Sequence, residues 1–210
     1  MDWGEYILAW AAFLGSHAVP ARPPVKARIV AATGRAGYAI GYSLLSVAML
    51  VWLIGAAGRA PHVPLWPPAT WQGWLTMAAM AAACLIVALA AFRPNPHSFG
   101  GWRNERFDPA RPGIAGTIRH PFLAALALWS LGHVAPNGDL AHAVMFGGFA
   151  AFALIGMRMI DRRRRRNPPP VSMPGPAPPI WHLPLRLAAA CVLFLGLIAL
   201  HPVAIGVPAW

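Results

Sequence analysis

Six apolar stretches separated by short basic segments constrain this chain more than any other feature of its sequence. A transmembrane helix needs about 20 mostly apolar residues, and the stretches are residues 3–19, 38–57, 71–92, 121–135, 140–160 and 185–207. The fourth stretch would rise only about 22 Å, so it has to begin in the headgroup layer or thin the bilayer locally. We therefore predict an all-α fold, a polytopic membrane helix bundle of about six transmembrane helices.

The composition agrees with a lipid environment. Hydrophobic residues make up 58% of the chain and charged residues 11%, whereas a soluble domain carries about 25% charged residues. This balance excludes a disordered chain, a collagen-like fibre and a secreted disulfide scaffold. Eight prolines between positions 168 and 184 predict an extended linker. The expected organisation is a membrane domain over residues 1–165, a proline-rich linker over 166–184 and a C-terminal transmembrane helix over 185–210.

Lysine and arginine are confined almost entirely to every second connection. Of the 17 basic residues, 16 lie in the connections after the first, third and fifth stretches or within three residues of them, and only Arg59 lies elsewhere. Basic connections stay in the cytoplasm, so we expect both termini in the periplasm. Asp2 and Glu5 stand where a cleavable signal would be positively charged, so the first stretch is expected to remain. The net charge of +11 then faces the anionic lipid bilayer and does not predict nucleic-acid binding.

Five histidines fall inside the apolar stretches or at their ends: His17, His120, His133, His142 and His201. A polar side chain at that depth is costly unless it is paired or bound, and imidazole is a usual axial ligand of haem iron. The helical spacing places Ser130 and Trp129 three and four residues before His133, as a hydrogen-bond partner and an aromatic neighbour. These residues predict haem b held between helices, against the alternative of histidines that only hydrogen-bond to a neighbouring helix.

The connection before the fourth stretch ends in Arg119, His120 and Pro121. Proline is favoured in the first turn of a helix because its missing N–H would be unpaired there in any case. We expect Arg119 and His120 at the headgroup level, where an ordinary interfacial helix start is the alternative to a binding site. Asp161, beside the arginine run that closes the fifth stretch, is explained by a local ion pair or by membrane anchoring.

Several short motifs, taken in their order along residues 1–165, resemble the NnrU family of bacterial inner-membrane proteins. They are Ser16-His17, Arg35 with Gly37-Tyr38, Asn95-Pro96, Gly113-Ile114, Arg119-His120-Pro121, Leu128-Trp129 with His133, Asn137-Gly138-Asp139, Phe146-Gly147 and Asp161-Arg162-Arg163. The resemblance implies location in the bacterial inner membrane and a link to denitrification and nitric oxide reduction.

The same motifs are similar to those of zeta-carotene isomerase, a membrane enzyme that uses haem b to isomerise a cis double bond. This likeness implies that His17 and His133 are the axial ligands. The isomerase has an alternative cysteine ligand three residues before the second histidine, and this chain has Ser130 there. The resemblance therefore implies either a redox role or an isomerase-like activity, with Trp129, Ser130, Arg119 and His120 as further cofactor-binding candidates.

Depth within the membrane favours other pairings. His17 lies near the cytoplasmic end of the first stretch, whereas His133 lies near the far end of the fourth. On depth alone His17 would pair with His120, and His133 would group with His142 and His201. Both pairings of His17 stay open from the sequence.

Two other functions fit parts of the sequence. Gly113-Ile114 followed by Arg119-His120-Pro121-Phe122 is similar to the cofactor motif of membrane methyltransferases that use S-adenosylmethionine. A non-enzymatic accessory subunit of a respiratory or nitrogen-oxide reductase complex is the other alternative, and it needs no chromophore.

Overall fold

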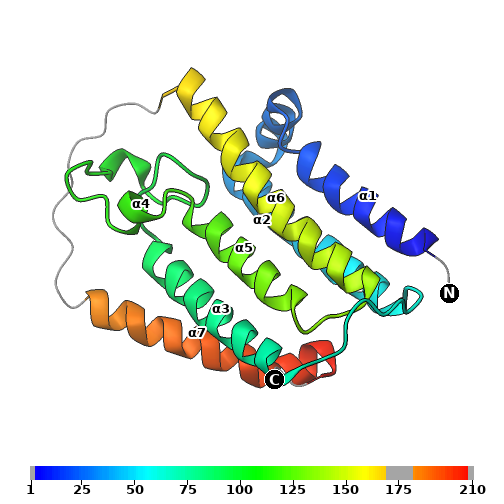
Figure 1. The fold of residues 1–210 in the computed structure, drawn as a ribbon. Helices are drawn as coiled ribbons and strands as arrows, with labels where there is room; N and C mark the ends of the chain where they lie inside the picture. The colour runs from blue at the N-terminus through cyan, green and yellow to red at the C-terminus, as the bar shows by residue number, and fades with distance from the viewer. Residues whose placement is uncertain (1–2, 169–181, 208–210) are drawn as a thin grey trace. The chain divides into compact units, whose positions relative to one another are not determined.

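The computed structural model describes residues 3–168 and 182–207, and the chain is helical throughout these ranges apart from its connections (Figure 1). The helices are α1 (Gly4–Ala18), α2 (Pro23–Arg59), α3 (Thr70–Ala90), α4 (Ile114–Thr117), α5 (Pro121–Val134), α6 (Leu140–Arg166) and α7 (His182–Ile205). The described residues hold one isolated β-bridge, between Pro64 and Asp139, and no strand. This architecture confirms the predicted all-helical class.

Four helices are long and apolar enough to cross a membrane, namely α2, α3, α6 and α7. Helix α5 is apolar but has 14 residues, in agreement with the short fourth span predicted from the sequence. Helix α1 has 15 residues. The chain is thus a membrane protein, and the crossing of the bilayer by α1 and α5 stays a prediction.

The chain divides into two compact units, which we describe separately. The first unit consists of residues 1–65 and 139–145, as far as these are described, and the second of residues 66–138 and 146–210. In the first unit α1 packs along α2. The Tyr6 hydroxyl donates to the carbonyl of Ala141 at 2.7 Å, and Arg59 forms an ion pair with Glu5. Arg59, the one basic residue outside the basic connections, is therefore matched by a carboxylate.

Helix α2 is longer than the predicted span over residues 38–57. It begins at Pro23, which occupies the first helical turn, and contains a kink at Gly34, where φ is 75° and ψ is 172°. A positive φ of this size is accessible to glycine and strained for other residues. The structure therefore extends the helix back through a basic segment that we had assigned to a connection.

In the second unit α3 contacts both α5 and α7, and α6 packs on α5 (Figure 1). Two small apolar clusters fill the contacts. Ala83, Ile86 and Ala125 join α3 to α5, and Leu123, Ala127 and Ala153 join α5 to α6. Small residues let these helices approach closely, as is typical of helix packing in membranes.

The remaining boundaries differ modestly from those predicted. Helix α6 continues through the whole arginine run to Arg166, because arginine is a good helix former. Helix α7 begins at His182, inside the predicted linker. The rest of that linker lies mostly in residues 169–181, which are outside the described part of the chain.

Candidate functional site

His133 lies in the last turn of α5, half-buried among aromatic rings. Its Nδ1 is 2.7 Å from the carbonyl oxygen of Trp129. A carbonyl oxygen only accepts, so Nδ1 carries the proton and Nε2 holds the lone pair. The imidazole is 5.3 Å from the Trp129 ring and 5.1 Å from the Phe146 ring, measured between centroids. The ring is thus held in one tautomer and one orientation.

Ser130 is not the hydrogen-bond partner of His133 that the helical spacing predicts. Its hydroxyl donates to the carbonyl of Leu126 at 2.7 Å, and the residue is fully buried. The hydrogen-bond partner of His133 is therefore the main chain of Trp129 and not the side chain of Ser130. The expected aromatic neighbour, Trp129, is in place.

A small cavity of about 30 Å³ separates His133 from His201 on α7. Thr76, Met77 and Met80 of α3 line it as well. This volume is that of a single water molecule, so a porphyrin does not fit in it. Of the residues that depth placed with His133, His201 shares this cavity, whereas His142 belongs to the first unit and lies 2.6 Å from Asp139, measured from Nδ1 to Oδ2.

His17 shows the same local arrangement as His133, in the first unit. Its Nδ1 is 2.7 Å from the carbonyl oxygen of Phe13, one helical turn earlier. The Phe13 ring lies 4.2 Å from the imidazole and the Tyr42 ring 5.9 Å from it, measured between centroids. Both histidines named by the family resemblance therefore have Nδ1 held by a main-chain carbonyl.

His120 stands at the opposite end of α5 and has different surroundings. It is 5% exposed, and its Nδ1 is 3.0 Å from the hydroxyl oxygen of Ser98, itself buried. Its Nε2 is 3.2 Å from Oδ1 of Asp161, although the two atoms are not aligned for a hydrogen bond. The imidazole is thus enclosed by protein side chains.

Arg119 and Asn95 complete this polar cluster. Nε of Arg119 lies 3.1 Å from Oδ1 of Asp161, and the Asn95 amide donates to the carbonyl of Arg119 at 3.0 Å. Asp161 therefore pairs across the fold with the residues that begin α5, and not with the arginines beside it in sequence. The cluster fastens the connection after α3 to the start of α5 and to α6.

A serine, a histidine and a carboxylate in this order also occur in hydrolases. Here Ser98 is 3% exposed and lines neither the 30 Å³ cavity nor a larger one of about 250 Å³ near the start of α5. A nucleophile has to reach its substrate, so this arrangement supports a structural role. Sequence reasoning missed Ser98, because its partner is 22 residues away along the chain; Asn95 carried a signal only in its Asn-Pro turn.

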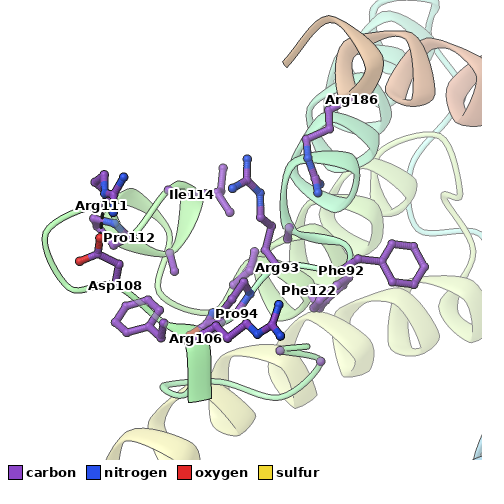
Figure 2. Close-up of a pocket in the computed structure, with 18 of the residues that line it drawn as sticks. Phe92, Arg93, Pro94, Arg106, Asp108, Arg111, Pro112, Ile114, Phe122 and Arg186 are labelled. Atoms are coloured by element: carbon purple, nitrogen blue, oxygen red, sulfur yellow. Dashed lines mark hydrogen bonds and ion pairs between the residues drawn. The ribbon is translucent and has the colours of Figure 1, made fainter. Parts of the chain in front are cut away.

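A cavity of about 250 Å³ lies where α3 ends and where α5 and α7 begin (Figure 2). Gly113 and Ile114 of the methyltransferase-like motif line it, whereas Arg119 and His120 of the same motif do not. Within the described residues, no three or more histidine, cysteine or acidic side chains are grouped so that they could hold a metal ion.

Comparison with known proteins identifies one relationship. The family model described as "NnrU protein" matches residues 5–209, nearly the whole chain. No curated protein and no solved structure matches the chain.

Proposed function

The chain belongs to the NnrU family, and on this premise we propose that this membrane protein binds haem b with His133 as one axial ligand. The observation that carries the proposal is the 2.7 Å contact between Nδ1 of His133 and the carbonyl of Trp129. Histidines that ligate metals almost always donate their other N–H to a carbonyl or carboxylate, which orients the ring and raises the basicity of Nε2. The donor chemistry of this residue therefore fits haem iron.

The aromatic neighbours of His133 support the same reading. Trp129 and Phe146 flank the imidazole, and Phe149 packs on Trp129 with ring centroids 5.6 Å apart. Flat apolar side chains of this kind pack well against a porphyrin and keep water from the iron. The haem of this proposal does not occupy the 30 Å³ cavity beside His133, which is too small for it.

The second axial ligand is His17 by the family resemblance, and its Nδ1 is held like that of His133. His120 is a poorer ligand because both of its ring nitrogens face polar side chains, Ser98 and Asp161. His201 is the competing ligand, since its Nδ1 is 2.7 Å from the carbonyl of Val207. When bound, haem b would supply one-electron redox chemistry, which fits a role in nitric oxide metabolism.

Substitution of each histidine tests this assignment. We expect His133→Ala and His17→Ala to remove the Soret band of detergent-purified protein expressed with ample haem. His120→Ala and His201→Ala are matched controls that should keep the band in whatever protein folds. A colourless wild-type protein would overturn the proposal, and loss of the band in His201→Ala with retention in His17→Ala would reassign the second ligand.

The proposed orientation in the bacterial inner membrane, with periplasmic termini, has support from the second unit. The third and fifth connections, which carry most of the arginines, meet where Ala90, Pro121 and Arg186 line one cavity. Basic connections at one end of a helical unit are what cytoplasmic retention requires. Reporter fusions at the two termini should both show periplasmic activity, and cytoplasmic activity at either terminus would contradict the orientation.

One observation favours the methyltransferase-like alternative, namely that Gly113 and Ile114 line a cavity. Isothermal titration with S-adenosylmethionine separates the two functions. The haem proposal predicts no heat of binding, and saturable binding that Gly113→Val abolishes would support the alternative.

A further inference from the structure

The larger cavity of the second unit carries an unbalanced positive charge. Arg93, Arg106, Arg111 and Arg186 line it together with one carboxylate, Asp108 (Figure 2). Asp108 accepts a hydrogen bond from Nε of Arg111 at 2.7 Å. The Arg111 guanidinium, helped by the Ala110 N–H, holds the pKa of Asp108 below its ordinary value. Asp108 therefore neutralises Arg111, and three guanidinium groups remain.

These three arginines have no carboxylate partner in the part of the chain that the structure describes. The arginines that form ion pairs there are Arg59, Arg111 and Arg119. Arg186 donates from Nη1 to the carbonyls of Ala88 at 2.6 Å and Ala91 at 2.9 Å, at the end of α3, while its buried Nε has no hydrogen-bond partner. Main-chain carbonyls orient this guanidinium but leave its charge uncompensated.

Arg93 and Arg186 line the same cavity from the end of α3 and the start of α7. Figure 2 shows the Arg93 side chain extending between Ile114 and Arg186. Like charges in a partly enclosed space repel each other more strongly than in bulk water. An anion in the cavity would offset this repulsion and supply acceptors for the guanidinium donors, whose planar fork matches phosphate oxygens.

Exposed aromatic residues indicate where this cavity lies with respect to the bilayer. Phe92, Phe99 and Trp102, in the same connection, are 79%, 51% and 56% exposed. Figure 2 shows the Phe92 ring directed away from Arg93. Tryptophan is enriched at the level of the lipid headgroups, which is also the level of the lipid phosphates.

We propose that the cavity bounded by Arg93, Arg106 and Arg186 binds a phosphate group. Its volume of about 250 Å³ lies just below the range of about 300–1,000 Å³ typical for drug-sized ligands, so the site suits a small anionic group. The exposed aromatic residues favour the headgroup of an anionic phospholipid as its source. A free phosphate compound is the other source of the same chemistry.

Two measurements on the full-length protein in detergent distinguish these sources. Native mass spectrometry with added phosphatidylglycerol or phosphatidylcholine detects a retained lipid, and isothermal titration with inorganic phosphate at constant ionic strength detects a free anion. We expect one phosphatidylglycerol molecule per chain, retained at least about tenfold better than phosphatidylcholine. Binding of inorganic phosphate alone would support the proposal with the second source.

The control separates this site from general attraction to anionic lipid. The double variant Arg93→Gln with Arg106→Gln should weaken lipid binding by about tenfold or more. The control variant, Arg163→Gln with Arg166→Gln, removes the same charge from exposed positions of α6, and it should change lipid binding by less than about twofold. If the first double variant does not fold, Arg93→Lys with Arg106→Lys keeps the charge but loses the planar fork, and should bind about threefold to tenfold more weakly. Equal losses in the site and control variants, or no binding of either probe to the wild-type protein, would overturn the proposal.

Discussion

A histidine stands at each end of α5, and the two imidazoles have different surroundings. His120, at the start, is enclosed by Ser98 and Asp161. His133, in the last turn, is bonded to its own helix and otherwise surrounded by rings. A histidine whose nitrogens both face protein side chains holds the fold together, whereas one with a single main-chain partner keeps a nitrogen for chemistry. Position along the helix alone therefore does not distinguish these two environments.

Removing each imidazole and measuring the free energy of unfolding tests this difference most directly. We expect His120→Ala to lower the free energy of unfolding by about 3 kcal/mol, because it leaves the buried Ser98 hydroxyl unpaired and opens a void. His133→Ala should lower it by about 1 kcal/mol. Unfolding in mixed detergents, followed by far-ultraviolet circular dichroism, measures both. Equal losses would mean that His133 is a structural histidine as well.

Gly132, beside His133, tests whether this end of α5 depends on close packing instead. A Cβ at this position would lie 2.8 Å from the Cβ of Ala79 on α3, so the helices would have to separate. Gly132→Val should cost about 2 kcal/mol of unfolding free energy in the same assay.

The matched control for that variant is Gly147→Val on α6, where an added Cβ meets no atom within 4 Å. A substitution at such an exposed position should change the free energy of unfolding by no more than about 0.5 kcal/mol. If both variants lost the same stability, the loss would come from the helix backbone and not from the contact with α3.

We expect a smaller loss of stability from removing the Thr76 hydroxyl, which contacts the same end of α5. Its hydroxyl lies 2.8 Å from the carbonyl of Gly132 and 2.9 Å from that of Gln72, and both the donor and its surroundings are buried. Thr76→Val keeps the shape and removes the hydrogen bond, which should cost about 1 kcal/mol. Thr76→Ser keeps the hydroxyl and should recover most of that loss; a neutral Thr76→Val would show that the bond adds nothing.

The smallest expected effect is a pH dependence at the start of α5. Burial, with the nearby Arg119 and Arg164, lowers the pKa of His97 below its ordinary value of 6.5. The unfolded chain therefore takes up a proton at His97 before the folded chain does, and stability should fall as the pH drops below 6.5. Thermal unfolding between pH 7.5 and 5.5 measures this slope, and His97→Gln should reduce it. An unchanged slope in that variant would assign the effect to other groups.

Most of the helical framework was predictable, because apolar length is a local property of the sequence. The predicted span 71–92 is close to α3, and the short fourth span matches α5. The early start of α2 was missed because a second, basic helical segment precedes the kink at Gly34, and basic residues there indicate a connection.

The polar cluster was less accessible to prediction. Arg119 and His120 carried a recognisable motif, but the pairing of Asp161 with them and the burial of Ser98 depend on contacts between residues far apart in sequence. Likewise, three arginines of the connection after α3 and Arg186 of α7 line one cavity, because α3 ends there and α5 and α7 begin there. A local sequence pattern can mark a polar residue or a basic connection, but it does not show which distant residues that segment will contact.

The kink at Gly34 divides α2 into two helical segments. A straight helix of 37 residues would measure about 55 Å, far more than the roughly 30 Å of hydrocarbon that it has to cross. The 25 residues after Gly34 are long enough to cross the hydrocarbon, and Lys26 and Arg28 lie in the helical segment before the kink. One glycine thus separates an apolar segment of membrane-crossing length from a basic segment of the same helix.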